Sequence, residues 1–296
     1  MKKATRSIAV IATAAILAGC STKESPSGRY SASQPKVANG FLGGFAPTIV
    51  PSYNEPGSNQ STNGTYQIAH SAPKTTSSRI FFDAVGSGQF QKVKDMIAKD
   101  KDVVNERISN GKTPLNWLAN LKTTGFTLGN GSLIPLTNSN ADSSVDCEMA
   151  ALLIEAGADL NTTDNSGRTP LINAITSDKV NLAKFLINKA CNVNQAIANG
   201  DYQGSAPLHA AVGHGEVEVI KMLFSKGAKI NSQTKDGSTP LHIAAMCDSE
   251  ASATLLMQLG ADPSIKNQKG QTPSDVAVAA GYTKIAEIIS QKNNTK

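Results

Sequence analysis

Apolar residues recur along most of this 296-residue chain in short runs with helical spacing. Four Pro-Leu pairs each open such a run, in which apolar residues stand three or four positions apart, as in Leu241-His242-Ile243-Ala244-Ala245. A second run with this spacing follows, as in Val217, Val219-Ile220 and Met222-Leu223-Phe224. Stretches rich in Gly, Asn and Asp separate the runs. The pattern predicts an all-α fold built from pairs of short helices.

One six-residue block opens each unit of this pattern. Its fullest form is Gly237-Ser238-Thr239-Pro240-Leu241-His242, and its third position is Thr in every copy except one, which has Ala206. That position falls at residues 113, 169, 206, 239 and 272, so successive copies are 56, 37, 33 and 33 residues apart. The unit is therefore 33 residues long, with insertions of 23 and 4 residues in the first two intervals. Thr can cap a helix and Pro fits its first turn, so the block predicts a helix start.

The block and a second motif downstream resemble the ankyrin repeat. The second motif, Gly-Ala-Asp/Lys-x-Asn, appears as Gly157-Ala158-Asp159-Leu160-Asn161 and as Gly227-Ala228-Lys229-Ile230-Asn231. Its Gly, like Gly260, is expected to end the second helix of a unit in the left-handed conformation. The resemblance implies an ankyrin-repeat solenoid of helix pairs with short hairpin loops, in which neighbouring units bury each other's apolar faces.

The N-terminus has the features of an export signal. Three basic residues precede the apolar run 8–17, which is too short to cross a bilayer as a permanent helix. Leu17-Ala18-Gly19-Cys20 resembles the bacterial lipobox, whose cysteine is lipidated and becomes the mature N-terminus. Because Ser21 follows Cys20, the resemblance further implies a place in the inner leaflet of the outer membrane, facing the periplasm. An ordinary secretory signal with an incidental cysteine is the alternative.

A tether separates this signal from the repeats. From Ser21 to about Ser78 the composition shifts to Ser, Thr, Asn, Gly and Pro, which cannot bury enough apolar surface to offset the entropy of ordering. Helical spacing returns with Ile80-Phe81-Phe82-Asp83-Ala84-Val85. The predicted segments are a signal peptide (1–19), a disordered tether (20–78), an N-terminal cap repeat (79–105), a repeat with a long insertion (106–161), three regular repeats (162–194, 195–231 and 232–264) and a C-terminal cap repeat (265–296).

The long insertion lies between the two helices predicted for the first full repeat, at 114–121 and 145–155. Long loops inside compact domains are usually functional or disordered. Apolar residues such as Phe126, Leu128 and Ile134 stand among its Gly, Asn, Ser and Thr residues. Two interpretations of residues 123–144 stay open: a finger that binds a partner, or a flap that covers its own repeat.

The charge distribution argues against a nucleic-acid partner. The formal net charge of +5 arises within residues 1–78, which hold seven Lys and Arg residues and two Glu. Residues 79–296 hold 21 basic and 21 acidic side chains, so the repeat region is neutral and shows no basic stripe. Beyond Cys20, the cysteines are Cys147, Cys191 and Cys247, an odd set from which no disulfide framework is expected. Cys191 replaces the Ala of Gly-Ala-Asp and is expected to be a small core residue.

No motif for catalysis, a cofactor or a metal occurs in the chain. GxSxG elbows, P-loops and CxxC pairs are absent from the sequence. His209 and His242 hold the last position of the block, where the ankyrin resemblance implies a hydrogen bond to the neighbouring hairpin. A metal site needs several ligands at one point, whereas repeats place these two histidines in a row. We therefore expect a non-enzyme without cofactors.

The remaining candidate for function is the loop edge of the array. The ankyrin resemblance implies that partners dock on hairpin tips and on the adjoining ends of the first helices. Four extra residues near Gln195–Gln203 lengthen one tip and extend its reach. With the apolar insertion included, the candidate protein-binding residues are Asn110, Lys112, Phe126, Leu128, Ile134, Asn165, Arg168, Asp201, Tyr202, Gln203, His214, Lys235, Asp236 and Met246.

These observations favour a monomeric, periplasm-facing lipoprotein that binds another protein through its repeats. Two purposes stay open: inhibition of a toxic or hydrolytic envelope protein, as an immunity-type partner, and scaffolding of an envelope complex. The alternatives are an enzyme with a site assembled across repeats, and an ankyrin effector acting in a host cell, which conflicts with the lipobox.

Overall fold

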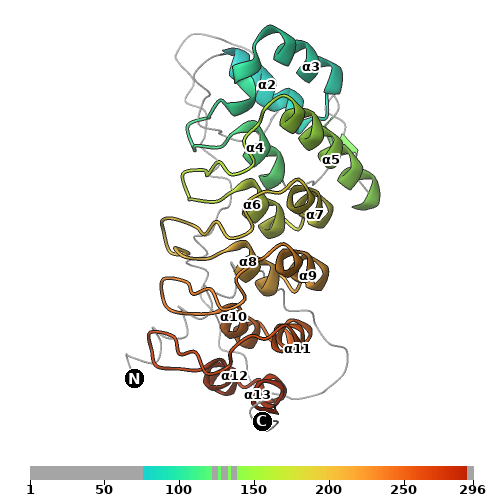
Figure 1. Cartoon of the computed structure of the whole chain (residues 1–296). Coiled ribbons are helices and arrows are strands. Elements are labelled where there is room, and N and C mark those ends of the chain that lie inside the picture. Colours follow the sequence, from blue (N-terminus) through green and yellow to red (C-terminus); the bar gives the residue numbers. More distant parts are fainter. Residues whose placement is uncertain (1–75, 122–125, 128–132, 135–138, 292–296) are drawn as a thin grey trace, which may run out of the picture. The chain divides into compact units, whose positions relative to one another are not determined.

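The structure is a computed structural model that describes residues 76–121, 126–127, 133–134 and 139–291. The predicted signal peptide, Cys20 and residues 21–75 of the predicted tether lie outside this part. Within it, helices follow one another as pairs stacked in chain order, with the hairpin loops along one edge (Figure 1). The all-α ankyrin-type solenoid predicted from the repeats is confirmed. None of the helices in the described ranges is long and apolar enough to span a membrane.

Each pair has an inner helix next to the hairpins and an outer helix behind it (Figure 1). The first pair is α2 (Thr76–Gly86) with α3 (Phe90–Lys99), closed by the 3₁₀ helix η1 (Lys101–Asn105). The others are α4 (Pro114–Asn120) with α5 (Ser139–Glu155), α6 (Pro170–Thr176) with α7 (Val180–Asn188), α8 (Pro207–Gly213) with α9 (Val217–Ser225), α10 (Pro240–Met246) with α11 (Glu250–Gln258), and α12 (Pro273–Ala280) with α13 (Thr283–Gln291).

The block starts each inner helix as its residue types predict. Pro occupies the first turn of α4, α6, α8, α10 and α12. The hydroxyls of Thr113, Thr169 and Thr272 accept hydrogen bonds from the backbone N–H three residues later, which satisfies a donor that the helix itself leaves unpaired. The helix starts are therefore set locally.

Glycines end the outer helices in the left-handed region. The φ angles of Gly157, Gly227 and Gly260 are 101°, 87° and 94°, which confirms the predicted caps. In the first regular repeat Ala190 holds this position with a φ of 59°, a conformation that is uncommon for residues other than glycine.

The Asn of the downstream motif joins one repeat to the next. The Asn105 amide donates to the carbonyl of Gly157 at 2.9 Å and accepts from the N–H of Asp159 at 3.0 Å. Asn194 makes the same pair of bonds with the repeat that follows it, at 2.9 Å each. This motif therefore specifies the spacing between repeats as well as the end of a helix.

One apolar core runs through the stack from Phe81 to Ile289. The leucine of the block is at most 1% exposed in all four copies that have it, namely Leu115, Leu171, Leu208 and Leu241. Burying one such side chain stabilises the fold by about 2 kcal/mol. Cys191 lies in this core as predicted, and burial raises the pKa of its thiol to about 11. Trp117 packs edge-on against Phe82, with ring centroids 6.1 Å apart.

Two predicted boundaries are wrong. Helix α5 begins at Ser139, whereas the apolar pattern placed the start at 145, because the added turns are polar and carry no periodic signal. Helix α2 begins at Thr76, within the segment predicted to be tether. The insertion also contains a short antiparallel pair, β1 (Phe126–Thr127) with β2 (Leu133–Ile134), in which Phe126 pairs with Ile134. These elements shorten the irregular part of the insertion.

Candidate protein-binding groove

Five hairpins form the loop edge, at residues 108–112, 164–168, 197–205, 234–238 and 267–271, numbered here first to fifth. In each of them the first residue donates its N–H to the carbonyl of the last residue, as Thr234 does to Ser238 at 3.0 Å. The tips also bond to one another. Backbone N–H groups donate to carbonyls of the preceding tip from Asn165 to Asn110 (3.0 Å), from Lys235 to Gln203 (2.8 Å) and from Gln268 to Asp236 (2.9 Å).

Glycine permits this close stacking. A Cβ atom on Gly204 would lie 2.8 Å from the backbone nitrogen of Lys235, and the φ of Gly204 is 85°. The hairpin edge is therefore a stack of backbone segments in direct contact, which holds the side chains at the tips in a fixed order.

The third hairpin differs from the others in its length. Ile197 donates to Ser205 and accepts from Gly204, so that the four extra residues extend the tip beyond its neighbours' length. Between the second and third tips the described residues supply only a side-chain bond, from Asn199 Nδ2 to the carbonyl of Asn165 at 3.4 Å. The longer tip carries Asp201, Tyr202 and Gln203 toward the inner helices.

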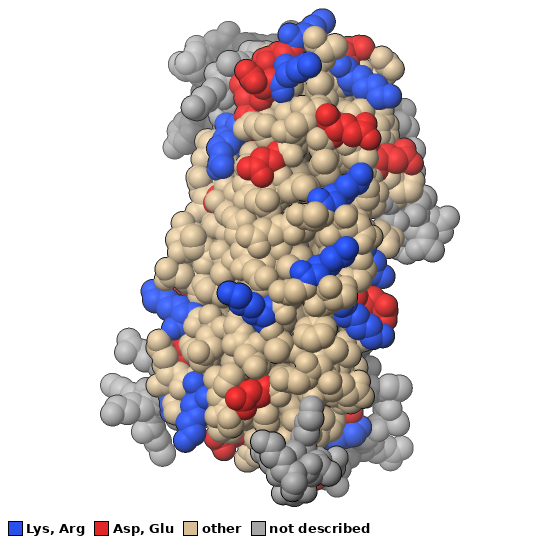
Figure 2. Space-filling view, viewed as in Figure 1, with Lys and Arg blue, Asp and Glu red and all other residues tan. Residues whose placement is uncertain are grey.

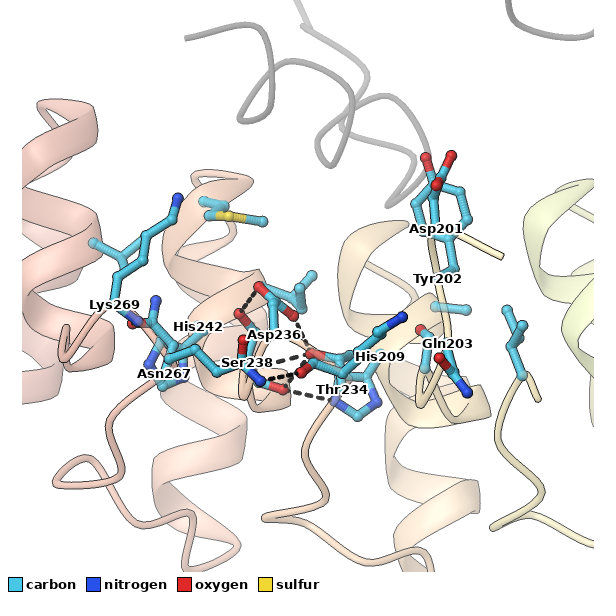
Figure 3. A pocket seen from close by; sticks show the side chains of 18 of the residues that line it. Asp201, Tyr202, Gln203, His209, Thr234, Asp236, Ser238, His242, Asn267 and Lys269 are labelled. Carbon is cyan, nitrogen blue, oxygen red and sulfur yellow. Dashed lines mark hydrogen bonds between the residues drawn. The ribbon is translucent and has the colours of Figure 1, made fainter. Parts of the chain in front are cut away.

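A groove of about 620 Å³ lies between the hairpins and the inner helices. Its floor is apolar and comes from successive inner helices, with Ile172 from α6, Ala210 from α8, Ile243 and Met246 from α10, and Val276 from α12. Polar tip residues form its rim. Figure 3 shows Asp201, Tyr202 and Gln203 at one side of this groove and Asn267 and Lys269 at the other.

His209 is buried at the base of the groove and is neutral. Its Nδ1 accepts the backbone N–H of Ala206 at 3.1 Å, so the proton is on Nε2, which donates to the carbonyl of Ser238 at 3.3 Å. Burial lowers the pKa of His209 to about 4. The ring joins the third repeat to the fourth hairpin, which confirms the predicted structural role.

His242 repeats this arrangement one unit later. Its Nδ1 accepts the N–H of Thr239 at 3.1 Å, and Nε2 donates to the carbonyl of Gln271 at 3.0 Å. Burial also lowers the pKa of His242. Both rings use their nitrogens internally, so neither offers a free base to a substrate.

Asp236 and Tyr202 have the most perturbed environments on the rim. Burial acts to raise the pKa of Asp236, but hydrogen bonds from Thr234 and Ser238 outweigh it and lower the pKa. The Ser238 hydroxyl donates to Asp236 Oδ2 at 2.7 Å, and the Thr234 hydroxyl donates to Oδ1. Burial, followed by the nearby Asp201 carboxylate, raises the pKa of Tyr202. The phenol is therefore neutral and only half-exposed.

Half of the predicted binding residues meet at this groove. Arg168, Asp201, Tyr202, Gln203, Lys235, Asp236 and Met246 all line it. Asn110, Lys112 and Asn165 lie outside it, and two of these stabilise the first two tips: Asn110 accepts from the N–H of Lys112, and Asn165 donates to the carbonyl of Ser109. Leu128 lies outside the described residues, and for Phe126 and Ile134 only the strand pairing is described.

The repeat pattern predicts that His214, at the end of an inner helix, faces the groove, and this prediction is wrong. It is the cap residue that follows α8, and its Nδ1 lies 2.8 Å from Asp178 Oδ1 in the preceding repeat. The side chain is 9% exposed and does not line the groove. Asp178, which has a φ of 58°, holds it at the turn between inner and outer helices.

The apolar residues of the groove floor were not predicted from the sequence. Ile172, Ile243 and Val276 fall at apolar positions of the inner helices, where sequence alone does not distinguish a core residue from a groove residue. In the described residues no three His, Cys, Asp or Glu side chains gather as a metal site. On the face seen in Figure 2, basic and acidic side chains are interspersed. The groove itself combines an apolar floor with a rim of both charges, which suits contact with a folded macromolecule.

A family model described as ankyrin repeats (3 copies) matches residues 140–234 and 228–296, more than half of the chain. Among curated proteins, the B-cell lymphoma 3 protein homolog of Mus musculus is 38% identical over 82 residues, 27% of this chain and 17% of that protein. An ankyrin repeat protein of Rickettsia felis is 35% identical over 86 residues, 29% of this chain and 28% of that protein. The chain thus spans under a third of the length of these relatives.

Among solved structures, one chain matches far more completely. It belongs to the structure titled Bd0816 predatory endopeptidase from Bdellovibrio bacteriovorus in complex with immunity protein Bd3460. The TM-score is 0.58 and the sequence identity 27%, and the match covers 72% of this chain and 97% of that one.

Proposed function

The chain belongs to the ankyrin-repeat family, and from this premise we propose that it is an immunity-type protein that binds an endopeptidase through its groove and inhibits it. The observation that carries the proposal is the likeness to a chain of an endopeptidase–immunity complex over 97% of that chain's length. A match of this extent concerns a whole repeat domain, whereas the curated relatives share only part of theirs.

The groove supports inhibition by steric covering of the partner's site rather than by a chemical reaction on the partner. Its histidines are neutral and hydrogen-bonded within the protein. Its rim offers a half-exposed Tyr202 beside charged tips, and aromatic and cationic residues of this kind carry most of the energy of protein interfaces. Because the tips are bonded to one another, the loops lose little conformational entropy on binding. An endopeptidase bound in this groove would have its active site covered.

The test uses the endopeptidase Bd0816 with the full chain. We expect cleavage of its peptide substrate to fall in proportion to added chain, and Tyr202→Ala to weaken binding by about tenfold or more, measured by calorimetry. Lys221→Ala is the matched control, because Lys221 is exposed on the outer helix α9 in an ion pair with Glu218. Absence of binding would refute the proposal, and binding with undiminished cleavage would replace inhibition by scaffolding.

We also propose that the protein acts from a lipid anchor on the periplasmic side of the bacterial outer membrane. Leu17-Ala18-Gly19-Cys20 and Ser21 support this part of the proposal. An immunity-type protein anchored in the compartment where an exported endopeptidase acts would bind the endopeptidase before the endopeptidase reaches its substrate. Cys20→Ser is expected to move the protein from the membrane to the soluble fraction after centrifugation. A variant that still sediments with membranes would contradict lipidation.

A further inference from the structure

Three cations on the groove rim have no ion-pair partner among the described residues. Arg168 is half-buried on the second hairpin, and Lys235 and Lys269 are exposed on the fourth and fifth. The ion pairs present in the described ranges are elsewhere, between Lys179 and Asp146, His214 and Asp178, Lys221 and Glu218, and Lys284 and Glu250. The three cations are therefore available to charges that a partner brings.

Two carboxylates share this rim with the cations. Both oxygens of Asp236 accept hydrogen bonds from the hydroxyls of Thr234 and Ser238, which hold the carboxylate in place and leave it ionised. Asp201 is exposed on the third hairpin, which follows the hairpin of Arg168 and precedes that of Lys235. Among the described residues the rim thus presents three positive and two negative side chains without an ion-pair partner, an excess of one positive charge.

The floor below these charges is apolar and only partly covered. Ile243, Met246 and Val276 are half-buried, and Ala279 and Ala280 are exposed. Ala210 of α8 holds the position that the larger Ile243 and Val276 hold in the two following repeats. An apolar side chain of a partner gains most by entering above it.

We propose that the groove takes an acidic segment of its protein partner, with a bulky apolar side chain at its centre and carboxylates on both sides of it. The apolar side chain lies on the floor between the third hairpin and α8, and the carboxylates meet Arg168 at one end and Lys235 and Lys269 at the other. This proposal rests on the groove being the binding surface, as proposed above, and adds the chemistry of the segment bound.

A protein segment fits this surface better than a nucleic acid does. Asp201 and Asp236 stand among the cations and would repel a continuous phosphate backbone. The floor is aliphatic and lacks the aromatic platforms on which bases stack. Carboxylates on a peptide can be spaced to avoid Asp201, whereas phosphates cannot.

The experiment selects peptides of about twelve residues from a random display library on the immobilised full chain. We expect the selected sequences to be enriched in Asp and Glu around an aliphatic or aromatic residue, and their affinity to fall by about tenfold from low salt to about 0.5 M NaCl. The triple variant Arg168→Glu, Lys235→Glu, Lys269→Glu is expected to select basic peptides instead. The matched control reverses three exposed lysines of the outer side, Lys94, Lys221 and Lys226, and is expected to leave the selection unchanged.

Three results would overturn the proposal. The first is selection without enrichment in acidic residues, and the second is equal loss in the control and rim variants. The third is a dimer of the full chain in sedimentation equilibrium that the rim variant dissociates, which would assign the groove to a second copy. Failure of Bd0816 inhibition is a separate outcome: if acidic peptides are still selected, the endopeptidase proposal fails and the chemistry of the segment stands.

Discussion

Replacing Lys179 with Ala is expected to lower the free energy of unfolding by about 3–5 kcal/mol. Lys179 precedes α7, and its ammonium lies 2.8 Å from Asp146 Oδ2 of α5 and donates to the carbonyl of Leu118 at 2.8 Å. The two charged side chains are only 6% and 14% exposed. Without the ammonium, the buried carboxylate of Asp146 loses its counter-charge and water cannot readily replace it.

The measurement is urea denaturation of the full chain followed by circular dichroism. Lys221→Ala again serves as control, because its ion pair with Glu218 is 53% and 63% exposed and such surface pairs contribute about 0–1 kcal/mol. The double variant Lys179→Met, Asp146→Leu is expected to recover much of the loss, since it removes both charges together. Equal effects of the Lys179 and Lys221 substitutions would show that the buried pair is not stabilising.

Acidification from about pH 7 to about pH 5 is expected to lower the stability of the fold by about 2 kcal/mol through His209. Its pKa falls from 6.5 in the unfolded chain to about 4 in the fold because burial disfavours the charged ring. Between these values the unfolded state binds the extra proton, so stability is complete above pH 6.5 and is lost as the pH falls toward 4. His242, whose pKa is also lowered, acts in the same direction.

The control for this effect is His209→Asn. Asn116 holds the same position of the block in the first full repeat and donates from Nδ2 to the carbonyl of Thr162 at 2.9 Å. The variant therefore keeps a donor and loses the titrating group. Its urea midpoint is expected to depend less on pH than that of the parent chain. An unchanged dependence would show that other groups are responsible.

Local rules explain why so much of the fold was predictable from the sequence. Thr, Pro and Leu of the block set the start of an inner helix. Gly of the second motif ends the outer helix, and Asn links the unit to the next. These signals recur, so each copy supports the others. The start of α5 escaped prediction because residues 139–144 are polar and no repeated residue marks it.

Residues of the candidate site were predictable only where a residue's position in the repeat fixes its place on a hairpin. Arg168 and Lys235 follow from their places on hairpins, and both line the groove. His214 shared that frame but turned to Asp178, a partner 36 residues away that no local pattern reveals. The pairing of Lys179 with Asp146 was equally invisible, because it depends on how α5 packs after the insertion.

Among the described residues, the Asn199–Asn165 side-chain bond is the only hydrogen bond between the second and third tips, so the hairpin edge consists of two separately bonded groups of tips. The groove spans both groups, since Arg168 belongs to the first and Lys235 to the second. A partner that contacts both groups would bridge them, and it would make the hairpin edge more rigid as well as fill the groove. Binding would then also stabilise the repeat array.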